Sequence, residues 1–343
     1  MLIVKSALLV SCLLGLGAAA QALEALPATP PIPADNPMST AKIALGQQLY
    51  FDPRLSVDGT VSCNSCHNVM SNGTDNRPVS IGVGGQKGGR SAPTVWNAAF
   101  LSVQFWDGRA ASLEEQAKGP ILNPIEMGMP SAAATVARIQ SIPGYAHAFA
   151  QVFAGKTPVT YEHIAMAIAA YERTLLTPNS AFDRYMKGDK KALSAQALRG
   201  MKLVEQTGCT GCHMGPDFAG PALPQGSGFY QKFPTFENND YVQKYHLKDD
   251  MGRYAVTKNV NDQHLWRVPS WRNVALTAPY FHNGSVATLE EAVRVMAKTQ
   301  LDKTLSDGDV ADIVAFLNSL TGEFPIEKMP RLPQTPNTAV TAQ

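Results

Sequence analysis

The sequence predicts a mostly α-helical protein built from two similar domains with long loops. Three observations predict this class. Helix signals recur along the chain, sustained alternation of apolar and polar residues is absent, and two distant segments repeat each other. The chain has 343 residues, of which 45% are hydrophobic and 17% charged. That composition is typical of a globular protein, and the length suggests about two domains.

Composition also excludes several classes of protein. With 29 Lys and Arg against 28 Asp and Glu, the formal net charge is +1, which argues against a nucleic-acid binder held by phosphate contacts. An aromatic content of 8% and a high apolar fraction argue against a disordered chain. The only long apolar run lies at the N-terminus, which excludes a protein with several membrane spans.

Residues 1–22 are typical of a secretory signal peptide. Lys5 supplies the positive charge, residues 7–20 form the apolar run, and Ala20-Gln21-Ala22 is a cleavage site. The alternatives are a buried first helix, a membrane anchor, or lipidation at Cys12. The run is short for a membrane span, and cleavage at Cys12 would leave too little apolar sequence before it. We therefore expect an exported protein of a bacterial periplasm, without a membrane span after cleavage.

Helix signals and stop signals define four segments in chain order. These are residues 40–51 before Asp52-Pro53, 161–176 before Thr177-Pro178, 193–206 before Gly208, and a helix that Ser306 and Asp309 open as a capping box and Gly322 ends. Gly- and Pro-rich loops lie at 82–93 and 215–234. The Pro-rich tail 324–343 is expected to be extended and to pack back on the first domain.

The strongest chemical signal is the motif C-x-x-C-H, which occurs twice and is the attachment signature of c-type haem. Cysteines three residues apart on a helical turn reach two vinyl groups, and the next histidine points at the iron. Disulfides or zinc are the alternatives for paired cysteines, but they leave two adjacent histidines unexplained. The sequence predicts covalent haems on Cys63, Cys66, Cys209 and Cys212, with His67 and His213 as iron ligands.

An internal repeat supports two similar units. Residues 97–115 and 273–291 share an Asn, an aromatic-x-x-Gly turn and the ending Ser/Thr-Leu-Glu-Glu, and each copy follows its own C-x-x-C-H motif. We therefore expect two cytochrome c-like domains, 23–176 and 177–323, each with one covalent haem.

The ligand opposite each histidine decides the chemistry, because a six-coordinate haem carries electrons and a five-coordinate haem binds peroxide or oxygen. Met296 follows the second motif and is a candidate for the second haem, where a methionine ligand raises the reduction potential. The alternative is core packing, because Leu289, Val293 and Met296 share one helical face.

Five long segments resemble the bacterial di-haem cytochrome c peroxidases, and the resemblance covers nearly the whole chain after residue 22. The segments are 45–56 (LGQQLYFDPRLS), 62–68 (SCNSCHN), 104–110 (QFWDGRA), 115–120 (EQAKGP) and 273–282 (NVALTAPYFH). The resemblance implies reduction of hydrogen peroxide to water at the low-potential first haem. A small cytochrome c or cupredoxin would supply electrons to the high-potential second haem, and members are often homodimers.

The resemblance also implies roles for four residues. Met296 matches the methionine ligand of the second haem, Gln116 and Glu126 match residues of the peroxide pocket, and Trp106 matches a tryptophan between the two haems. The role of Glu126 makes chemical sense, because O–O cleavage needs a group that takes up and returns a proton. Without the resemblance, the simplest interpretation of Glu126 is a solvated loop residue, and that of Trp106 is a core residue.

Members of this family bind calcium between the domains, and the matching positions are Ser91, Thr277 and Pro279. The family residue at the first position is usually asparagine, so Ser91 departs from the pattern. Backbone carbonyls at 277 and 279 still offer the oxygen ligands that a hard cation prefers.

A second departure lies in the glycine-rich loop 80–90. Many members have a histidine there that caps the peroxidatic haem in the oxidised enzyme, and the matching residue here is Val83. Valine cannot bind iron, so either the first haem is permanently open or another residue caps it. We expect the first of these.

Two rival functions stay open at this point. One is a di-haem enzyme that oxidises a partner protein, whose second haem would carry a tyrosine where this chain has Met296. The other is a di-haem electron-transfer cytochrome, in which both haems are six-coordinate and Glu126 has no role.

Overall fold

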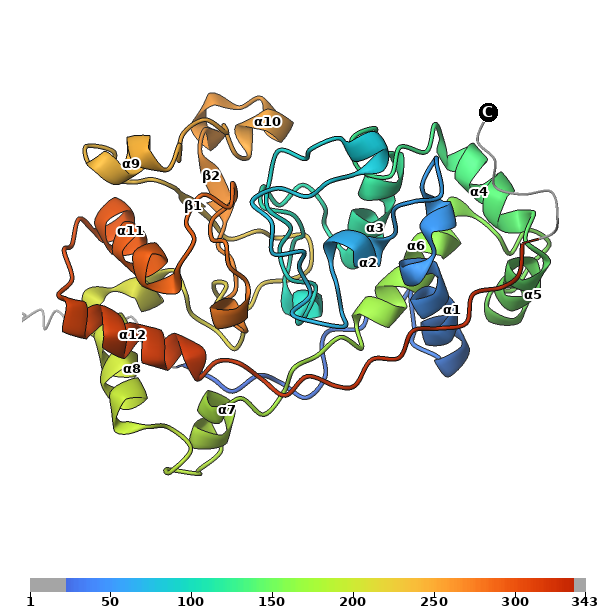
Figure 1. Cartoon of the computed structure of the whole chain (residues 1–343). Helices are drawn as coiled ribbons and strands as arrows, with labels where there is room; N and C mark the ends of the chain where they lie inside the picture. Colours follow the sequence, from blue (N-terminus) through green and yellow to red (C-terminus); the bar gives the residue numbers. More distant parts are fainter. Residues whose placement is uncertain (1–22, 336–343) are drawn as a thin grey trace, which may run out of the picture.

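A computed structural model describes residues 23–335 (Figure 1). The predicted signal peptide, Cys12 and residues 336–343 lie outside the described residues. Helices dominate, which confirms the mostly helical class, and within residues 23–335 none of them combines the length and apolar character needed to cross a bilayer. The helices are α1 (Thr40–Phe51), α2 (Cys63–Cys66), α3 (Leu113–Leu122), α4 (Ala132–Gln140), α5 (Pro143–Val152), α6 (Tyr161–Glu172), α7 (Ala181–Met186), α8 (Ala195–Thr207), α9 (Asp240–Lys244), α10 (Tyr254–Thr257), α11 (Leu289–Leu301) and α12 (Asp307–Asn318).

The four predicted helices are all present, with differences at their ends. Helix α1 has the predicted bounds, and α12 begins at the predicted capping box of Ser306 and Asp309. Helix α6 ends at Glu172, four residues before the predicted end at residue 176. The residues that follow form a tighter turn, in which hydrogen bonds span three residues and not four. The N–H groups of Thr174 and Leu175 donate to the carbonyls three residues earlier, at 2.8 and 3.0 Å. A single antiparallel pair, β1 (Tyr230–Lys232) with β2 (Leu265–Arg267), is the sheet of the described chain.

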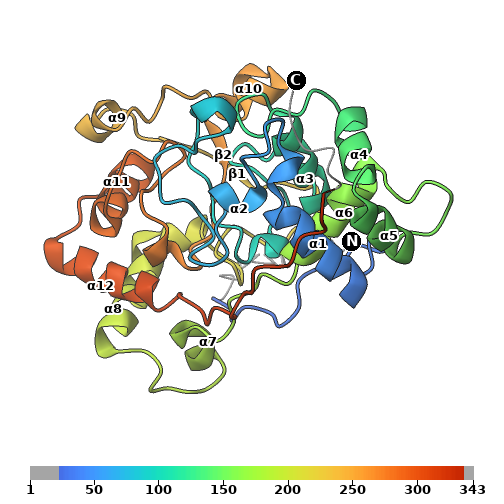
Figure 2. The same ribbon diagram turned by 45° about the vertical axis from the view of Figure 1, so that its right-hand side comes forward.

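The helices gather into two groups, each with its own buried core. Figures 1 and 2 show α1 and α3 to α6 on one side and α7, α8, α11 and α12 on the other. Leu49, Tyr50 and Ile164 are fully buried in the first core, and Phe182 and Phe316 are fully buried in the second.

A glycine allows the closest helix contact in each group. Gly46 of α1 lies against α6, where a Cβ atom would overlap the carbonyl oxygen of Ala167. Gly200 of α8 lies against α12, where a Cβ atom would overlap the carbonyl oxygen of Asp312. Since both obstacles are backbone atoms, no side chain can rotate away to make room, and the helices would have to separate.

We expect Gly46→Ala and Gly200→Ala each to lower the free energy of unfolding by about 1–3 kcal/mol, the usual cost of overpacking. The matched control is Gly308→Ala in α12, where a Cβ atom meets only the Ser306 hydroxyl oxygen at 3.8 Å. The control should gain up to about 1 kcal/mol from helix propensity. Denaturant unfolding of the three variants measures both effects, and equal stability of all three would contradict the packing argument.

The internal repeat is visible in the backbone. Corresponding residues of the two copies share the left-handed conformation, with φ of 64° and 60° at Asn97 and Asn273, 68° and 70° at Phe105 and Phe281, and 64° and 57° at Gly108 and Gly284. The side-chain amides of Asn97 and Asn273 both donate to the Thr177 hydroxyl, at 2.7 and 2.9 Å. Thr177 therefore joins the two copies where the groups meet.

The chain ends cross between the two groups. Leu23 belongs to the second core, and the Leu26 N–H donates to Asp183 Oδ1 at 2.9 Å. At the other end the chain leaves α12 and runs along the first group (Figure 1). There Phe324 packs edge-on against Trp96, and Gln47 Nε2 donates to the Lys328 carbonyl at 3.1 Å.

Candidate functional site

A cavity of about 410 Å³ lies within the first helix group. The first C-x-x-C-H motif, which spans α2 and the residue after it, forms one part of the lining. The cavity brings together every residue that the sequence predicts for the first haem and the peroxide pocket: Cys63, Cys66, His67, Trp106, Gln116 and Glu126.

The His67 ring is oriented by its neighbours. Its Nδ1 lies 2.9 Å from the Pro93 carbonyl oxygen, so Nδ1 carries the proton and Nε2 has a free lone pair. The Tyr50 hydroxyl donates to the His67 carbonyl at 2.7 Å. Burial lowers the pKa of His67, which favours the neutral imidazole. A neutral ring held through its other nitrogen is the form that binds iron.

Gln116 and Glu126 reach the same cavity from α3 and from the turn that follows it. Ser112 caps α3 through the Glu115 N–H, which fixes the start of the helix. Burial raises the pKa of Glu126, while the Arg109 charge and a hydrogen bond with Asn123 oppose the rise. Glu126 is therefore a sheltered carboxylate and not a solvated loop residue.

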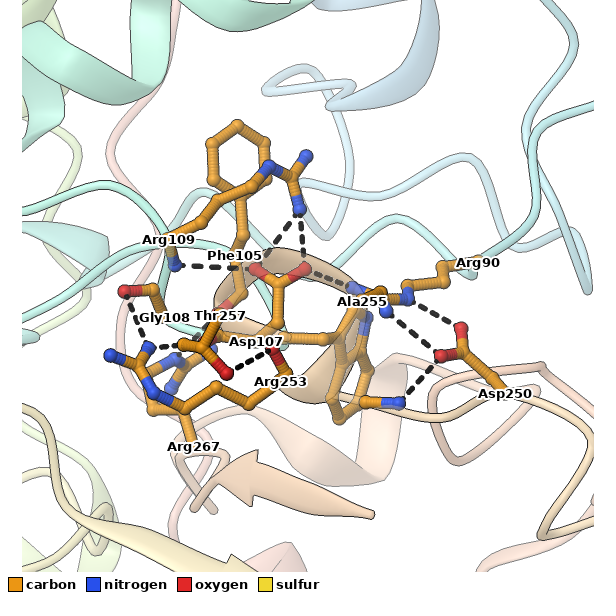
Figure 3. Close-up of polar contacts among 12 residues, drawn as sticks. Arg90, Phe105, Asp107, Gly108, Arg109, Asp250, Arg253, Ala255, Thr257 and Arg267 are labelled. Carbon is orange, nitrogen blue, oxygen red and sulfur yellow. Dashed lines mark hydrogen bonds and ion pairs between the residues drawn. The ribbon is translucent and has the colours of Figure 1, made fainter. Parts of the chain in front are cut away.

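A charged cluster stands beside Glu126 at the cavity wall. Figure 3 shows Asp107 between Arg109 and Arg90, with Asp250 beyond Arg90. Arg109 Nη1 lies 3.0 Å from both Asp107 carboxylate oxygens, and Arg90 Nη1 lies 2.6 Å from Asp107 Oδ2. Arg90 also binds Asp250 through two hydrogen bonds of 2.7 and 2.9 Å. The cluster ties the loop that ends at Arg90 to the segment between α9 and α10.

A second cavity of about 210 Å³ contains Cys209, His213 and Met296. His213 Nδ1 lies 3.0 Å from the Phe218 carbonyl oxygen, and the ring stacks on Trp271 at 4.3 Å. Burial lowers the pKa of His213 to about 4, so this imidazole is neutral as well. Met296 reaches the cavity from α11, so a methionine and a histidine line one space.

Trp106 lies in the wall that the two cavities share. Trp106, Phe105, Gln104 and Pro93 each line both cavities. The Trp106 indole N–H donates to the Ser91 carbonyl at 2.9 Å, which fixes the ring. The structure thus places Trp106 between the two cavities.

The three positions predicted for calcium, Ser91, Thr277 and Pro279, all line the second cavity. The Ser91 carbonyl already accepts the Trp106 N–H, and its hydroxyl lies 3.5 Å from the Arg77 carbonyl oxygen. In the described part of the chain, no group of three or more His, Cys, Asp and Glu side chains is arranged to hold a metal ion. A calcium site here would depend on backbone carbonyls.

Val83 is a buried core residue that does not line either cavity. Its Cγ2 would lie 3.0 Å from a Cβ atom at Gly128, so the side chain points toward the turn at 128. Its N–H donates to the Glu126 carbonyl at 2.9 Å, and Gln86 Nε2 donates to the Pro124 carbonyl at 2.9 Å. The loop is thus tied to the turn that carries Glu126.

The structure adds further charged residues to the predicted site, and three of them are Arg109, Glu172 and Arg267. Arg109 and Glu172 line the first cavity, and Arg267 lines the second. Glu172 is buried in α6, and burial raises its pKa to about 8. Arg109 follows the Trp-Asp-Gly turn, a position that could have drawn attention to it. The other two carry no sequence signal, because only the packing of distant segments brings them to the cavities.

The residues of both cavities fit covalent haem. Both thiols of the first motif line the first cavity, whereas Cys209 but not Cys212 lines the second. In each cavity the histidine of the motif keeps Nε2 available, and apolar side chains dominate the rest of the lining. The described cysteines form no disulfide, so their thiols are available for thioether bonds.

The chain is similar to known proteins over most of its length. Residues 40–191 match the family described as di-haem cytochrome c peroxidase. The chain is 47% identical to the cytochrome c551 peroxidase of Pseudomonas aeruginosa over 305 residues, covering 88% of this chain and 85% of that protein. It is 44% identical to the cytochrome c551 peroxidase of Nitrosomonas europaea, covering 91% and 90%. A crystal structure of a MauG-like protein associated with microbial copper homeostasis superposes with a TM-score of 0.74 at 31% identity, covering 86% and 93%. The chain therefore belongs to the di-haem cytochrome c peroxidase family.

Proposed function

We propose that this protein reduces hydrogen peroxide to two waters in the bacterial periplasm. One observation carries the proposal: His67, Gln116 and Glu126 line a single cavity beside the first C-x-x-C-H motif. A small cytochrome c or a cupredoxin is the proposed electron donor. The comparisons with named cytochrome c peroxidases support the peroxide-reducing activity.

We propose two cytochrome c-like domains, 23–176 and 177–323, with the extended tail 324–343, assembled as a homodimer. Cys63 and Cys66 would attach one haem with His67 as ligand, and Cys209 and Cys212 a second with His213 and Met296. The separate cores and cavities of the two helix groups support this division. Carbonyl oxygens at Thr277 and Pro279, with Ser91, are the proposed ligands of a calcium ion.

The haems, when bound, supply the two electrons that peroxide reduction consumes. The residues of the first cavity provide the remaining requirements. Gln116 donates a hydrogen bond that orients peroxide, and Glu126 accepts a proton from one peroxide oxygen. Glu126 then returns that proton to the other oxygen, which leaves as water. The Arg109 charge beside Glu126 favours its ionised form before the transfer. Two protons from solvent complete the two waters.

The position of Val83 makes a prediction about activation. Since Val83 is buried and cannot bind iron, the fully oxidised protein should reduce peroxide without prior reduction. Initial rates of the purified holo-protein, with and without pre-reduction, should agree within about twofold. A long lag, or inactivity until half-reduction, would show that another residue caps the first haem.

The same preparation separates the rival functions. A high-spin first haem in the oxidised protein supports a peroxidase, whereas two low-spin haems and no peroxide turnover indicate an electron-transfer cytochrome. Oxidation of a partner protein, without peroxide-dependent oxidation of a small electron donor, would indicate the di-haem enzyme that oxidises a partner protein. Met296 at the second cavity favours the peroxidase over that alternative.

A further inference from the structure

Arg267 is a buried arginine at the junction of the two cavities. It ends β2, is 5% exposed, and lines the second cavity with His213 and Met296. Its backbone N–H donates to the Trp106 carbonyl at 2.9 Å, and its Nε donates to the Phe105 carbonyl at 3.1 Å. The side chain thus contacts the wall between the cavities on one side and faces the second cavity on the other.

The hydrogen bonds of this guanidinium all go to neutral acceptors. Besides the Phe105 carbonyl, the Val268 carbonyl accepts from Nη1 at 3.1 Å. Across residues 23–335, no carboxylate oxygen lies within 4.0 Å of the Arg267 nitrogens. Asp217, Tyr230 and Asp107 act on it only at longer range.

Arg272 is a second buried arginine of the same cavity, and it has a carboxylate partner. It also lines the second cavity, and its Nη1 lies 2.8 Å from Asp183 Oδ1, with both side chains 1% exposed. Burial lowers the pKa of both arginines, that of Arg267 to about 10, yet the Arg267 guanidinium stays charged at neutral pH. A buried charge without a counter-ion is costly, so an anion is expected beside Arg267.

The second cavity indicates which anion that is. A c-type haem bound there through Cys209 and His213 carries two carboxylates, and an arginine fork matches carboxylate geometry. We propose that Arg267 binds a carboxylate of the second haem and that its charge raises the reduction potential of that haem. This inference rests on the assignment of the second cavity to a haem under Proposed function. The sign follows from electrostatics, because a nearby positive charge favours the reduced iron, which carries one positive charge less.

The experiment compares three variants of the holo-protein by spectroelectrochemical titration of each haem. Arg267→Gln removes the charge, and Arg267→Lys retains it. The control is Arg253→Gln. Arg253 donates a 2.9 Å hydrogen bond to the carbonyl of Asp107, the residue after Trp106, but lines neither cavity. At the wild-type midpoint of the second haem, Arg267→Gln should lower the reduced-to-oxidised ratio about tenfold, which is 59 mV for one electron. Arg267→Lys should shift less, and Arg253→Gln should not shift.

Each outcome decides the proposal. A wild-type potential for the second haem in Arg267→Gln, or an equal shift in Arg253→Gln, would overturn it. If Arg267→Gln loses the second haem, Arg267→Lys decides: retention of the haem supports a charge requirement, and loss in both variants reduces Arg267 to a packing role. The titration uses no peroxide, so a failed peroxidase assay leaves this inference intact. A wild-type protein that lacks a second haem would instead refute the cofactor assignment.

Discussion

Replacing Glu126 by glutamine is expected to lower kcat/KM for hydrogen peroxide by about 10²–10⁴-fold, the usual contribution of a positioned general acid–base group. Glutamine keeps the shape of the side chain but cannot accept and return a proton, so the visible spectra of both haems should persist. The matched control is Glu115→Gln on α3, where the side chain is 53% exposed and pairs with Lys118 at the surface. Wild-type turnover in Glu126→Gln would remove Glu126 from the reaction.

The pH profile provides an independent test of the same residue. Burial raises the pKa of Glu126 above its ordinary value of 4.5, so the carboxylate takes up its proton at a higher pH than an exposed glutamate. Since the ionised form is the base, the rate should fall as pH drops through that raised pKa. Arg109→Gln removes the charge that opposes the rise and should move the acid limb to higher pH. Glu126→Gln should show no such limb.

Met296→Leu should lower the reduction potential of the second haem on the order of 0.1 V or more, within the range of about 0.8 V that axial ligands control. Leucine nearly conserves the volume, so packing against the core around Trp266 should survive while the sulfur ligand is lost. Turnover with a reduced small cytochrome c should fall at least about tenfold, since 59 mV already changes the equilibrium tenfold.

The control for that variant is Met201→Leu, a half-buried methionine of α8 that packs against the second core and lines neither cavity. Its haem potentials should stay at the wild-type values. If Met296→Leu also keeps the wild-type potential, Met296 is a core residue that fills space, which is the alternative that its helical face allowed.

The sequence predicted those features that depend on local spacing or on a repeat. Helix α1 has the predicted bounds because the Asp-Pro stop is a local signal, and the structure shows that Ser39 caps its start through the Lys42 N–H. The two C-x-x-C-H motifs singled out His67 and His213, each of which lines a cavity. The repeated residues at 97–115 and 273–291 predicted two copies, and the structure shows that corresponding residues share left-handed backbone.

Other parts of the site depend on packing between distant segments. The early end of α6 follows from bonds in the turn beyond it, and the burial of Arg267 follows from β2 meeting the turn at Trp106. The side-chain direction of Val83 depends on its packing toward the turn at Gly128. Residue type alone carries no information on such contacts.

Each end of the described chain packs against the helix group that lies farther away in the sequence. The first residues that the structure describes contribute to the core of the later group, where the Arg272 guanidinium donates to the Glu24 carbonyl at 3.2 Å. The last ones run beside α1 of the earlier group, where Gln48 binds the Arg331 carbonyl at 3.0 Å. The earlier group therefore cannot complete its packing during synthesis until the chain beyond α12 has emerged. We therefore expect the two halves to unfold together, and separation of one half by proteolysis to expose part of the core of the other.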